Sequence, residues 1–378
     1  MTASINAAER ERAAVSLREI AGVFLKLGTT AFGGPAAHIA MMEEEVVRRR
    51  GWLTHEDFLD YLGAANLIPG PNSTELAIHV GHAMAGWAGL LMAGACFILP
   101  AVLIVSVIAW VYVRFGALPQ TVGILAGIKP VVIAIVMQAI WNLGRRAVKS
   151  PWLAVLGVGS LVAVALGVNE LVVLAVAGVL AAMRVAEPRA NARFAGVVAA
   201  GVASPTTLGV WPLFLVFAKI GAVLFGSGYV LIAFLRADLV ERLHWLTDKQ
   251  LIDAIAVGQV TPGPVFTTAT FVGYVLAGGG GAAVATIGIF LPAFVFVALS
   301  GPLVPRLRGS RVAGAVLDGV NVASLALMTE AAGQIARTAI SGWISIVILV
   351  ATIVLLVRTK INSAWLVLAS AAIGLVGM

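Results

Sequence analysis

Residues 69–75 read PGPNSTE, and residues 262–268 read PGPVFTT. The shared tripeptide is Pro69, Gly70 and Pro71 in the first stretch and Pro262, Gly263 and Pro264 in the second. Proline lacks a backbone N–H and clashes with the preceding helical turn, and glycine adds backbone freedom. Each tripeptide is therefore expected to end one helix and begin another, because proline also suits the first turn of a new helix.

The composition around these breaks is that of a membrane protein. Of 378 residues, 60% are hydrophobic and only 11% are charged, whereas soluble domains carry roughly a quarter charged residues. Residues 86–113 contain no charged residue, and a run of this length can cross about 30 Å of hydrocarbon. Uninterrupted apolar runs argue against a spanning barrel, whose strands alternate in polarity. The expected fold class is an all-α polytopic membrane protein.

Several other classes are excluded or disfavoured by what the sequence contains. The polar N-terminal stretch has no apolar core of a cleavable signal, and the single Cys96 offers neither a disulfide framework nor a cysteine metal site. The net charge of +7 comes from short basic clusters between apolar runs, as in cytoplasmic loops, so no nucleic-acid partner is expected. No phosphate-binding G-x-x-x-x-G-K-[ST] loop, HExxH motif or nucleophile elbow is present. We expect neither an enzyme nor a cofactor.

The chain contains two copies of one unit. FLKLGTTAFGG from Phe24 aligns with FAKIGAVLFGS from Phe217, so that Lys26 matches Lys219. The same offset aligns GWLTHEDFLD with HWLTDKQLID and one PGP with the other, and after a one-residue deletion Gly127 matches Gly319. Such ordered repetition indicates duplication. We assign residues 1–195, including an N-terminal lead, to the first repeat and residues 196–378 to the second.

The number of spans predicts the orientation of the two copies. If the opening helix spans, the PGP-broken helical hairpin enters and leaves on one side, and four further spans follow, each copy crosses the membrane about five times. An odd number of crossings inverts the second copy. Basic loops then gather on one side, which the positive-inside rule makes cytoplasmic. These loops hold Arg145, Arg146, Lys149, Arg184, Arg306, Arg308, Arg358 and Lys360.

Broken helices at matching positions of two halves indicate a transporter binding site. Unpaired backbone at membrane depth is tolerated only inside protein or beside a watery cavity, and the N-termini of half-helices direct N–H groups at anions. The hydrogen-bonding side chains in these first turns are Asn72, Ser73, Thr74, Thr267 and Thr268. Helix capping and packing are the structural alternative for them.

Lys26 and Lys219 are the second indication of an anion site, because an ionisable residue in an apolar segment is functional by default. Snorkelling to an interface is the alternative. Two lysines and two helix N-termini would form a positive cavity suited to an oxyanion. Glycines near Phe32, namely Gly33 and Gly34, and Gly226 in the second copy would allow close backbone approach to an ion.

Further polar residues are candidates for coupling or for the pathway. Glu75, His79 and His82 share one helix face at i, i+4 and i+7, but the second copy lacks this set, and a metal site is not expected. Glu75 or Glu330 is the candidate proton-coupling carboxylate. Lys129 and Asn321 occupy matching positions and either line the pathway or pair between helices. The stretch EEEVVRRR at 43–50 is interpreted as a solvated loop.

Taken together, these motifs resemble the chromate ion transporter family of the long, two-domain type. The resemblance covers essentially the whole chain and rests on FLKLGTTAFGGPAAHIAMMEEEV, GWLTHEDFLDYLGAANLIPGPNSTELAIHVG, FAKIGAVLFGSGYV and QVTPGPVFTTATFVGY. It implies a multi-pass carrier of the bacterial inner membrane that exports chromate and is driven by an ion gradient. The implied functional positions are Lys26, Phe32, Gly33, Gly34, Asn66, Pro69, Gly70, Pro71, Asn72 and Glu75.

The resemblance leaves alternatives open. The second copy has Gln259 for Asn66 and Val265 for Asn72, so the halves are not expected to contribute equally. Chromate and sulfate are both tetrahedral dianions, so a sulfate or general oxyanion carrier is one alternative and an anion channel is another. The expected partners are chromate, sulfate as a second candidate, protons as coupling ion and the lipid bilayer, and a homodimer remains open.

Overall fold

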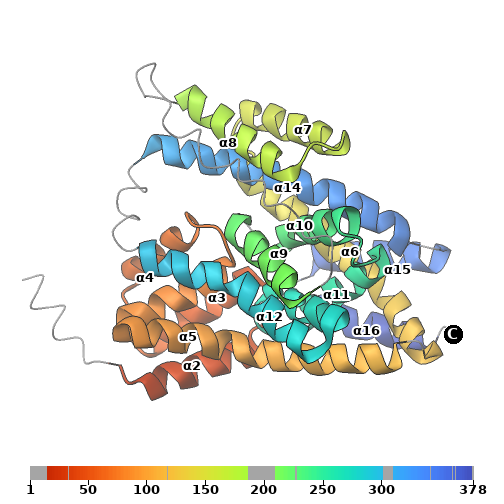
Figure 1. Cartoon of the computed structure of the whole chain (residues 1–378), viewed down its shortest axis with the longest axis horizontal. Coiled ribbons are helices and arrows are strands. Elements are labelled where there is room, and N and C mark those ends of the chain that lie inside the picture. Colours follow the sequence, from red (N-terminus) through yellow and green to blue (C-terminus); the bar gives the residue numbers. More distant parts are fainter. Residues whose placement is uncertain are drawn as a thin grey trace, which may run out of the picture.

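The computed structural model describes residues 15–32, 34–116, 118–185, 209–225, 228–300, 310–340, 342–359, 361 and 363–376. These residues form helices joined by short connections, with no strand among them (Figure 1). The helices of the first half are α2 (Leu17–Thr30), α3 (Pro35–Glu43), η1 (Glu44–Arg49), α4 (His55–Ala65), α5 (Asn72–Phe115), α6 (Pro119–Ala147), α7 (Pro151–Ala165) and α8 (Glu170–Val185). Those of the second half are α9 (Val210–Val223), η2 (Gly228–Val230), α10 (Leu231–Leu235), η3 (Arg236–Arg242), α11 (Asp248–Val260), η4 (Val265–Thr267), α12 (Thr268–Ser300), α14 (Arg311–Ala339), α15 (Trp343–Arg358) and α16 (Ser363–Val376).

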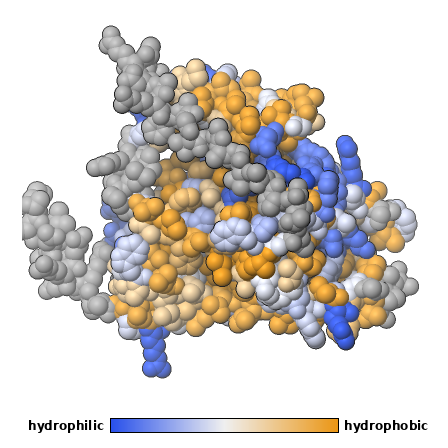
Figure 2. Space-filling view, in the orientation of Figure 1, coloured by the Kyte–Doolittle hydropathy of each residue, from blue (hydrophilic) through white to orange (hydrophobic). Residues whose placement is uncertain are grey.

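The helical membrane protein expected from composition is confirmed. Four of the described helices are long and apolar enough to cross a membrane, at Asn72–Phe115, Thr121–Ala147, Val265–Ser300 and Arg311–Ala339. Hydrophobic residues cover much of the visible face along α5 and α12 (Figure 2). The opening helices α2 and α9 have 14 residues each, a length of about 21 Å at 1.5 Å per residue. Either helix alone is shorter than the hydrocarbon core.

Both PGP tripeptides separate helices, as their prolines predict. Helix α4 ends at Ala65 and α5 begins at Asn72, with Pro71 as its N-cap. In the second half α11 ends at Val260, and Pro264 precedes the 3₁₀ turn η4 that leads into α12. Gly70 and Gly263 have φ angles of +139° and +90°, a backbone region that residues with a side chain rarely adopt.

The two halves share further local features at matching positions. Helix α5 kinks at Gly86 and α12 kinks at Gly278, with φ angles of +58° and +64°. These kinks divide each long helix into a short arm that follows PGP and a longer arm. Thr54 and Thr247 cap α4 and α11 through matching capping boxes, which satisfy backbone donors at the two helix starts.

Helices from one half pack on helices of the other. Helices α7 and α8 lie against α14, whereas α15 and α16 lie against α6, and the first of these arrangements is visible in Figure 1. Small residues allow the approach: a β-carbon on Gly319 would lie 2.4 Å from the carbonyl oxygen of Ala177, and one on Gly127 would lie 2.1 Å from that of Ser370. Helices α5 and α12 also contact each other, so the PGP-linked arms belong to one common core.

One interpretation of the sequence is wrong. The stretch EEEVVRRR at 43–50 is not a solvated loop, because Glu43 completes α3 and the following residues form the π-helix η1. Glu45 within it is only 6% exposed. Its carboxylate forms ion pairs with Lys26, Arg49 and Arg50, and these cations offset the cost of burying a charge.

Candidate functional site at the two helix breaks

The two PGP tripeptides are joined across the halves by reciprocal hydrogen bonds. The N–H of Gly70 donates to the carbonyl oxygen of Leu224 at 2.8 Å, and the N–H of Gly263 donates to that of Ala31 at 3.0 Å. Leu224 and Ala31 are the C-cap residues of α9 and α2, so each break satisfies a helix end of the opposite half. The arrangement brings both breaks and both opening helices to one place.

A small cavity lies between the breaks. Its lining comes in matching pairs from the two halves: Pro35 with Gly228, Pro71 with Pro264, Asn72 with Val265, and Ser73 with Phe266. The cavity volume is about 20 Å³, which is room for about one water molecule. A tetrahedral oxyanion does not fit, so the structure holds the centre closed.

A buried histidine joins the start of α5 to the end of α2 within the first half. His38 on α3 has Nε2 3.1 Å from the carbonyl oxygen of Ala31 and Nδ1 3.3 Å from the hydroxyl of Ser73. A carbonyl only accepts, so Nε2 is the donor, and Nδ1 of the neutral ring then accepts from Ser73. Burial lowers the pKa of His38 to about 4, although the hydrogen bond to Ala31 raises it. Ser73, His38, Ala31 and Gly263 therefore form one chain.

The start of α5 carries most of the polar side chains predicted for the site. Asn72 donates from its amide nitrogen to the side-chain oxygen of Asn66 at 2.5 Å. The structure thus brings together two predicted residues on either side of the PGP turn. The backbone N–H groups of Asn72 and Ser73 belong to the first turn of the helix, where no intrahelical partner exists. This end of α5 offers both N–H groups and side-chain donors.

Glu75 lies in the same first turn and is fully buried. Neither of its carboxylate oxygens has a hydrogen-bond partner among the described residues, and the hydroxyl of Thr74 has none there either. The carboxylate lies beside the PGP turn, since a β-carbon on Gly70 would lie 2.3 Å from Oε1. His79, one turn further, stacks on Tyr61 with ring centroids 5.8 Å apart, and His82 meets Trp87.

The second half has less polar chemistry at the matching positions. Val265 and Phe266 replace Asn72 and Ser73 in the cavity wall. The hydroxyls of Thr267 and Thr268 donate to the carbonyl oxygens of Pro264 and Val265, each at 2.8 Å. Both threonines are fully or almost fully buried. Their local hydrogen bonds fit the packing role that was the alternative for these residues.

The two predicted lysines each pair with a carboxylate of their own half. Lys26 contacts Glu45 at 3.0 Å, and Lys219 contacts Asp238 at 2.5 Å. The side chain of Lys26 is 50% exposed, whereas that of Lys219 is 16% exposed. Neither lysine lines the central cavity. Sequence reasoning missed both carboxylates, although each stands 19 residues after its lysine.

The remaining predicted residues are divided among several places. Lys129 pairs with Asp253 at 3.4 Å in a second cavity near the end of α5. Glu330 on α14 accepts a hydrogen bond from Gln334, and Asn321 lies on the same helix. Phe32 is exposed beyond α2, Gly34 is the N-cap of α3, and Gln259 is buried near the end of α11. Gly33 and Gly226 lie outside the described residues, as does the boundary proposed at 195 and 196.

Apolar spanning helices, two broken helices that meet in the core and an anion-compatible helix start define a polytopic membrane transporter. The family model described as "Chromate transporter" matches the chain twice, over residues 18–182 and 211–375. The chain belongs to the chromate transporter family. This finding confirms the resemblance drawn from the motifs.

Curated relatives agree with the family. The chain is 35% identical over 375 residues to a "Chromate transport protein" of Cupriavidus metallidurans, a match that covers 96% of this chain and 93% of the relative. It is 30% identical over 337 residues to a "Probable chromate transport protein" of Synechococcus elongatus, with 86% of each covered. It is 32% identical over 315 residues to a "Chromate transport protein" of Pseudomonas aeruginosa, with 79% and 76% covered. No solved structure matches the chain.

Proposed function

We propose that this chain is a secondary carrier that exports chromate from the cytoplasm across a bacterial inner membrane. The observation that carries the proposal is the meeting of the two PGP breaks, whose matched residues enclose one small cavity. The names of three curated relatives, all of which are matched over most of their length, supply the substrate. Because the paired residues come from both halves, the site would open and close as the halves move against each other.

In this account the anion binds at the start of α5. The N–H groups of Asn72 and Ser73, the side chains of both residues and the partial positive charge of the helix start act as donors. The bonds from Gly70 to Leu224 and from Gly263 to Ala31 hold the halves in the closed state. Either half can move away from the other only when these two bonds open.

Inverted orientation of the halves would make this movement reversible across the membrane. The inversion rests on the duplicated sequence and on an odd number of crossings for each copy, which requires the 14-residue helices α2 and α9 to count as crossings, and it is common among secondary carriers. Lys26 and Lys219 act in the cycle as cations that the anion reaches once their pairs with Glu45 and Asp238 open. Thr267 and Thr268 support the second break, and Asn321 and Glu330 lie along the route.

Glu75 is the proposed proton-coupling group. An ionised carboxylate without a partner is costly inside a protein, and ionisable residues within spanning helices mark ion and proton pathways. The carboxylate of Glu75 lies beside Gly70, at the same helix start as the anion donors. A bound dianion and an ionised Glu75 would repel each other, so occupancy by the anion and the charge of Glu75 are linked.

The test is uptake of labelled chromate into inside-out vesicles that contain the full chain. Saturable uptake that resists equal sulfate and stops when the proton gradient or the membrane potential is collapsed supports a coupled chromate exporter. Suppression by equal sulfate would instead indicate a general oxyanion carrier. Flux that does not saturate and ignores both gradients would indicate a channel. Vesicles without the protein, and vesicles with a Glu75→Gln variant, are the controls.

A further inference from the structure

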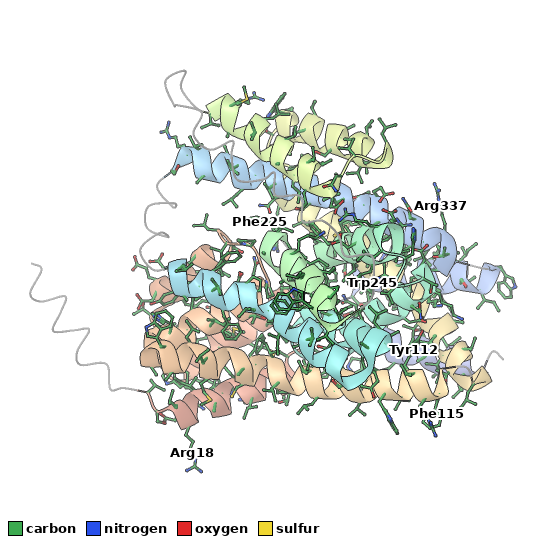
Figure 3. The ribbon with its side chains drawn as sticks, in the orientation of Figure 1. Arg18, Tyr112, Phe115, Phe225, Trp245 and Arg337 are labelled. Atoms are coloured by element: carbon green, nitrogen blue, oxygen red, sulfur yellow. The ribbon has the colours of Figure 1, made fainter. Side chains whose placement is uncertain are left out.

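A second and larger cavity lies away from the PGP breaks. Its volume is about 530 Å³, and its walls come from the end of α5, the first half of α6, the start of α11, a residue of α12 and the end of α14. Tyr112 marks its place near the C-terminal end of α5 in Figure 3. The polar residues in its walls are Tyr112, Lys129, Lys249, Gln250, Asp253 and Thr338.

A buried carboxylate organises this cavity. The side chain of Asp253 is fully buried, accepts a hydrogen bond from the hydroxyl of Tyr112 at 2.9 Å and lies 3.4 Å from Nζ of Lys129. The ion pair is loose, because Oδ1 of Asp253 lacks a hydrogen bond of normal geometry within the described chain. The side chain of Lys129 is 13% exposed, and both Lys129 and Asp253 line the cavity.

The cavity carries a net positive charge. Two ammonium groups, of Lys129 and Lys249, face one carboxylate, of Asp253. Lys249 is exposed and stands in the first turn of α11, where the helix dipole also favours an anion. Gln250 accepts with its side-chain oxygen from Thr247, which leaves its amide hydrogens as donors. The two ammonium groups and this amide can donate hydrogen bonds to the oxygens of a dianion.

The matching positions of the other copy carry a different set of charges. In the alignment of the two copies, Lys249 matches Glu56, Asp253 matches Asp60, and Lys129 matches Asn321. These three counterparts include two carboxylates and no cation, a set that would repel an oxyanion, so the two lysines are particular to this cavity. Packing alone gives no reason for this difference, since Lys249 is exposed and Lys129 lines the cavity.

We infer that this cavity is a second oxyanion station on the transport route, in which Lys129 exchanges its partner Asp253 for the anion. The inference rests on the proposed function, because it takes the transported dianion as its ligand. Lys249 captures the anion at the mouth, and Tyr112 keeps one hydrogen bond on Asp253 while Lys129 turns away. The anion then sits at a site separate from the pair of PGP breaks.

The experiment measures equilibrium binding of radiolabelled chromate to the purified full chain in nanodiscs. Lys249→Gln and Lys129→Gln are each expected to weaken binding at one class of site about tenfold, as expected for a lost charge-assisted hydrogen bond. Asp253→Asn frees Lys129 and is expected to tighten binding several-fold. A purely structural ion pair predicts the opposite sign for Asp253→Asn. Lys149→Gln is the matched control, because Lys149 is an exposed lysine paired with Asp318 outside the cavity.

The outcomes separate this inference from the proposed function. If the wild-type chain takes up chromate into vesicles but the two lysine variants bind it as the wild type does, the second station is wrong and the carrier stands. Weaker binding by Asp253→Asn overturns the exchange of partners. If the wild-type chain neither binds nor moves chromate, both proposals fail. Lys249→Gln keeps the test decisive even where a buried variant misfolds, because Lys249 is exposed.

Discussion

The two PGP breaks have closely related backbones and very different side chains. Both glycines occupy positive φ and donate to a C-cap carbonyl of the opposite half. Around the first break lie Asn72, Ser73 and the buried Glu75, whereas Val265, Phe266 and two locally satisfied threonines surround the second. The two halves therefore share the backbone architecture of the break, whereas the polar side chains are concentrated in the first half.

The largest expected effect is the difference in chromate uptake between a variant of Glu75 and a variant of its counterpart Thr268. Glu75→Gln keeps the shape of the side chain but removes the ionisable group, so coupled chromate uptake should fall by about 100-fold, within the range for losing a proton-transfer group. Thr268→Val removes only a local hydrogen bond and should leave uptake within about twofold. Initial rates in vesicles with an imposed proton gradient measure both. Equal losses would show that the breaks are not chemically distinct.

Substitution of the two paired lysines should lower the stability of the protein by different amounts. Lys219→Ala leaves Asp238, which is only 3% exposed, with Arg242 as its remaining cation, so we expect a loss of about 2 kcal/mol. Lys26→Ala removes a half-exposed pair and should cost less than about 1 kcal/mol, while chromate resistance of cells is lost. Thermal unfolding in detergent and growth on chromate provide the two readouts. Retained resistance at equal expression would remove Lys26 from the mechanism.

An exchange of residues between the two breaks tests which half supplies the polar residues that line the central cavity. Asn72→Val gives the first half the residue of the second, and it should raise KM for chromate about tenfold because a donor to the anion is lost. Val265→Asn adds an amide to the second-half wall of the central cavity and should change KM by less than about threefold. Concentration dependence of uptake gives both values. A larger effect from Val265→Asn would reverse the assignment of the two halves.

The smallest effect is expected at His38, whose counterpart in the second half is Leu231. His38→Asn retains a polar group, but the shorter side chain cannot hydrogen-bond both Ser73 and Ala31. The free energy of unfolding should therefore fall by about 1 kcal/mol. Leu231→Ile alters apolar packing alone and serves as the matched control. Thermal unfolding of the two variants tests the comparison, and equal shifts would leave His38 without a linking role.

Much of the fold follows from the sequence. The charge-free run at 86–113 predicted the long arm of α5, which follows the kink at Gly86, and the prolines predicted the breaks. The packing of α8 on α14 and of α16 on α6 could not be predicted, because apolar faces in a membrane do not specify their partner. Small residues such as Gly127 and Gly319 allow that packing, but they are common in membrane helices.

The candidate site was predictable only in part. Asn72, Ser73 and Glu75 were predicted as candidates because they follow a PGP tripeptide, which is a local signal. Glu45 was interpreted as part of a loop, since the charges of EEEVVRRR look solvated until Lys26 on another helix is placed beside them. His38 lacks a local signal of any kind: its importance comes from Ser73 and Ala31, which only the folded chain brings to it.

The central claim is that the transported anion binds between the two PGP breaks, and a cryo-electron microscopy structure of the full chain with bound chromate tests it most directly. We predict tetrahedral density between Pro71 and Pro264, contacted by Asn72 and Ser73, with the hydrogen bonds of Gly70 or Gly263 opened to make room. Chromate density confined to the cavity of Lys129 and Lys249, with the central cavity still closed, would contradict the claim.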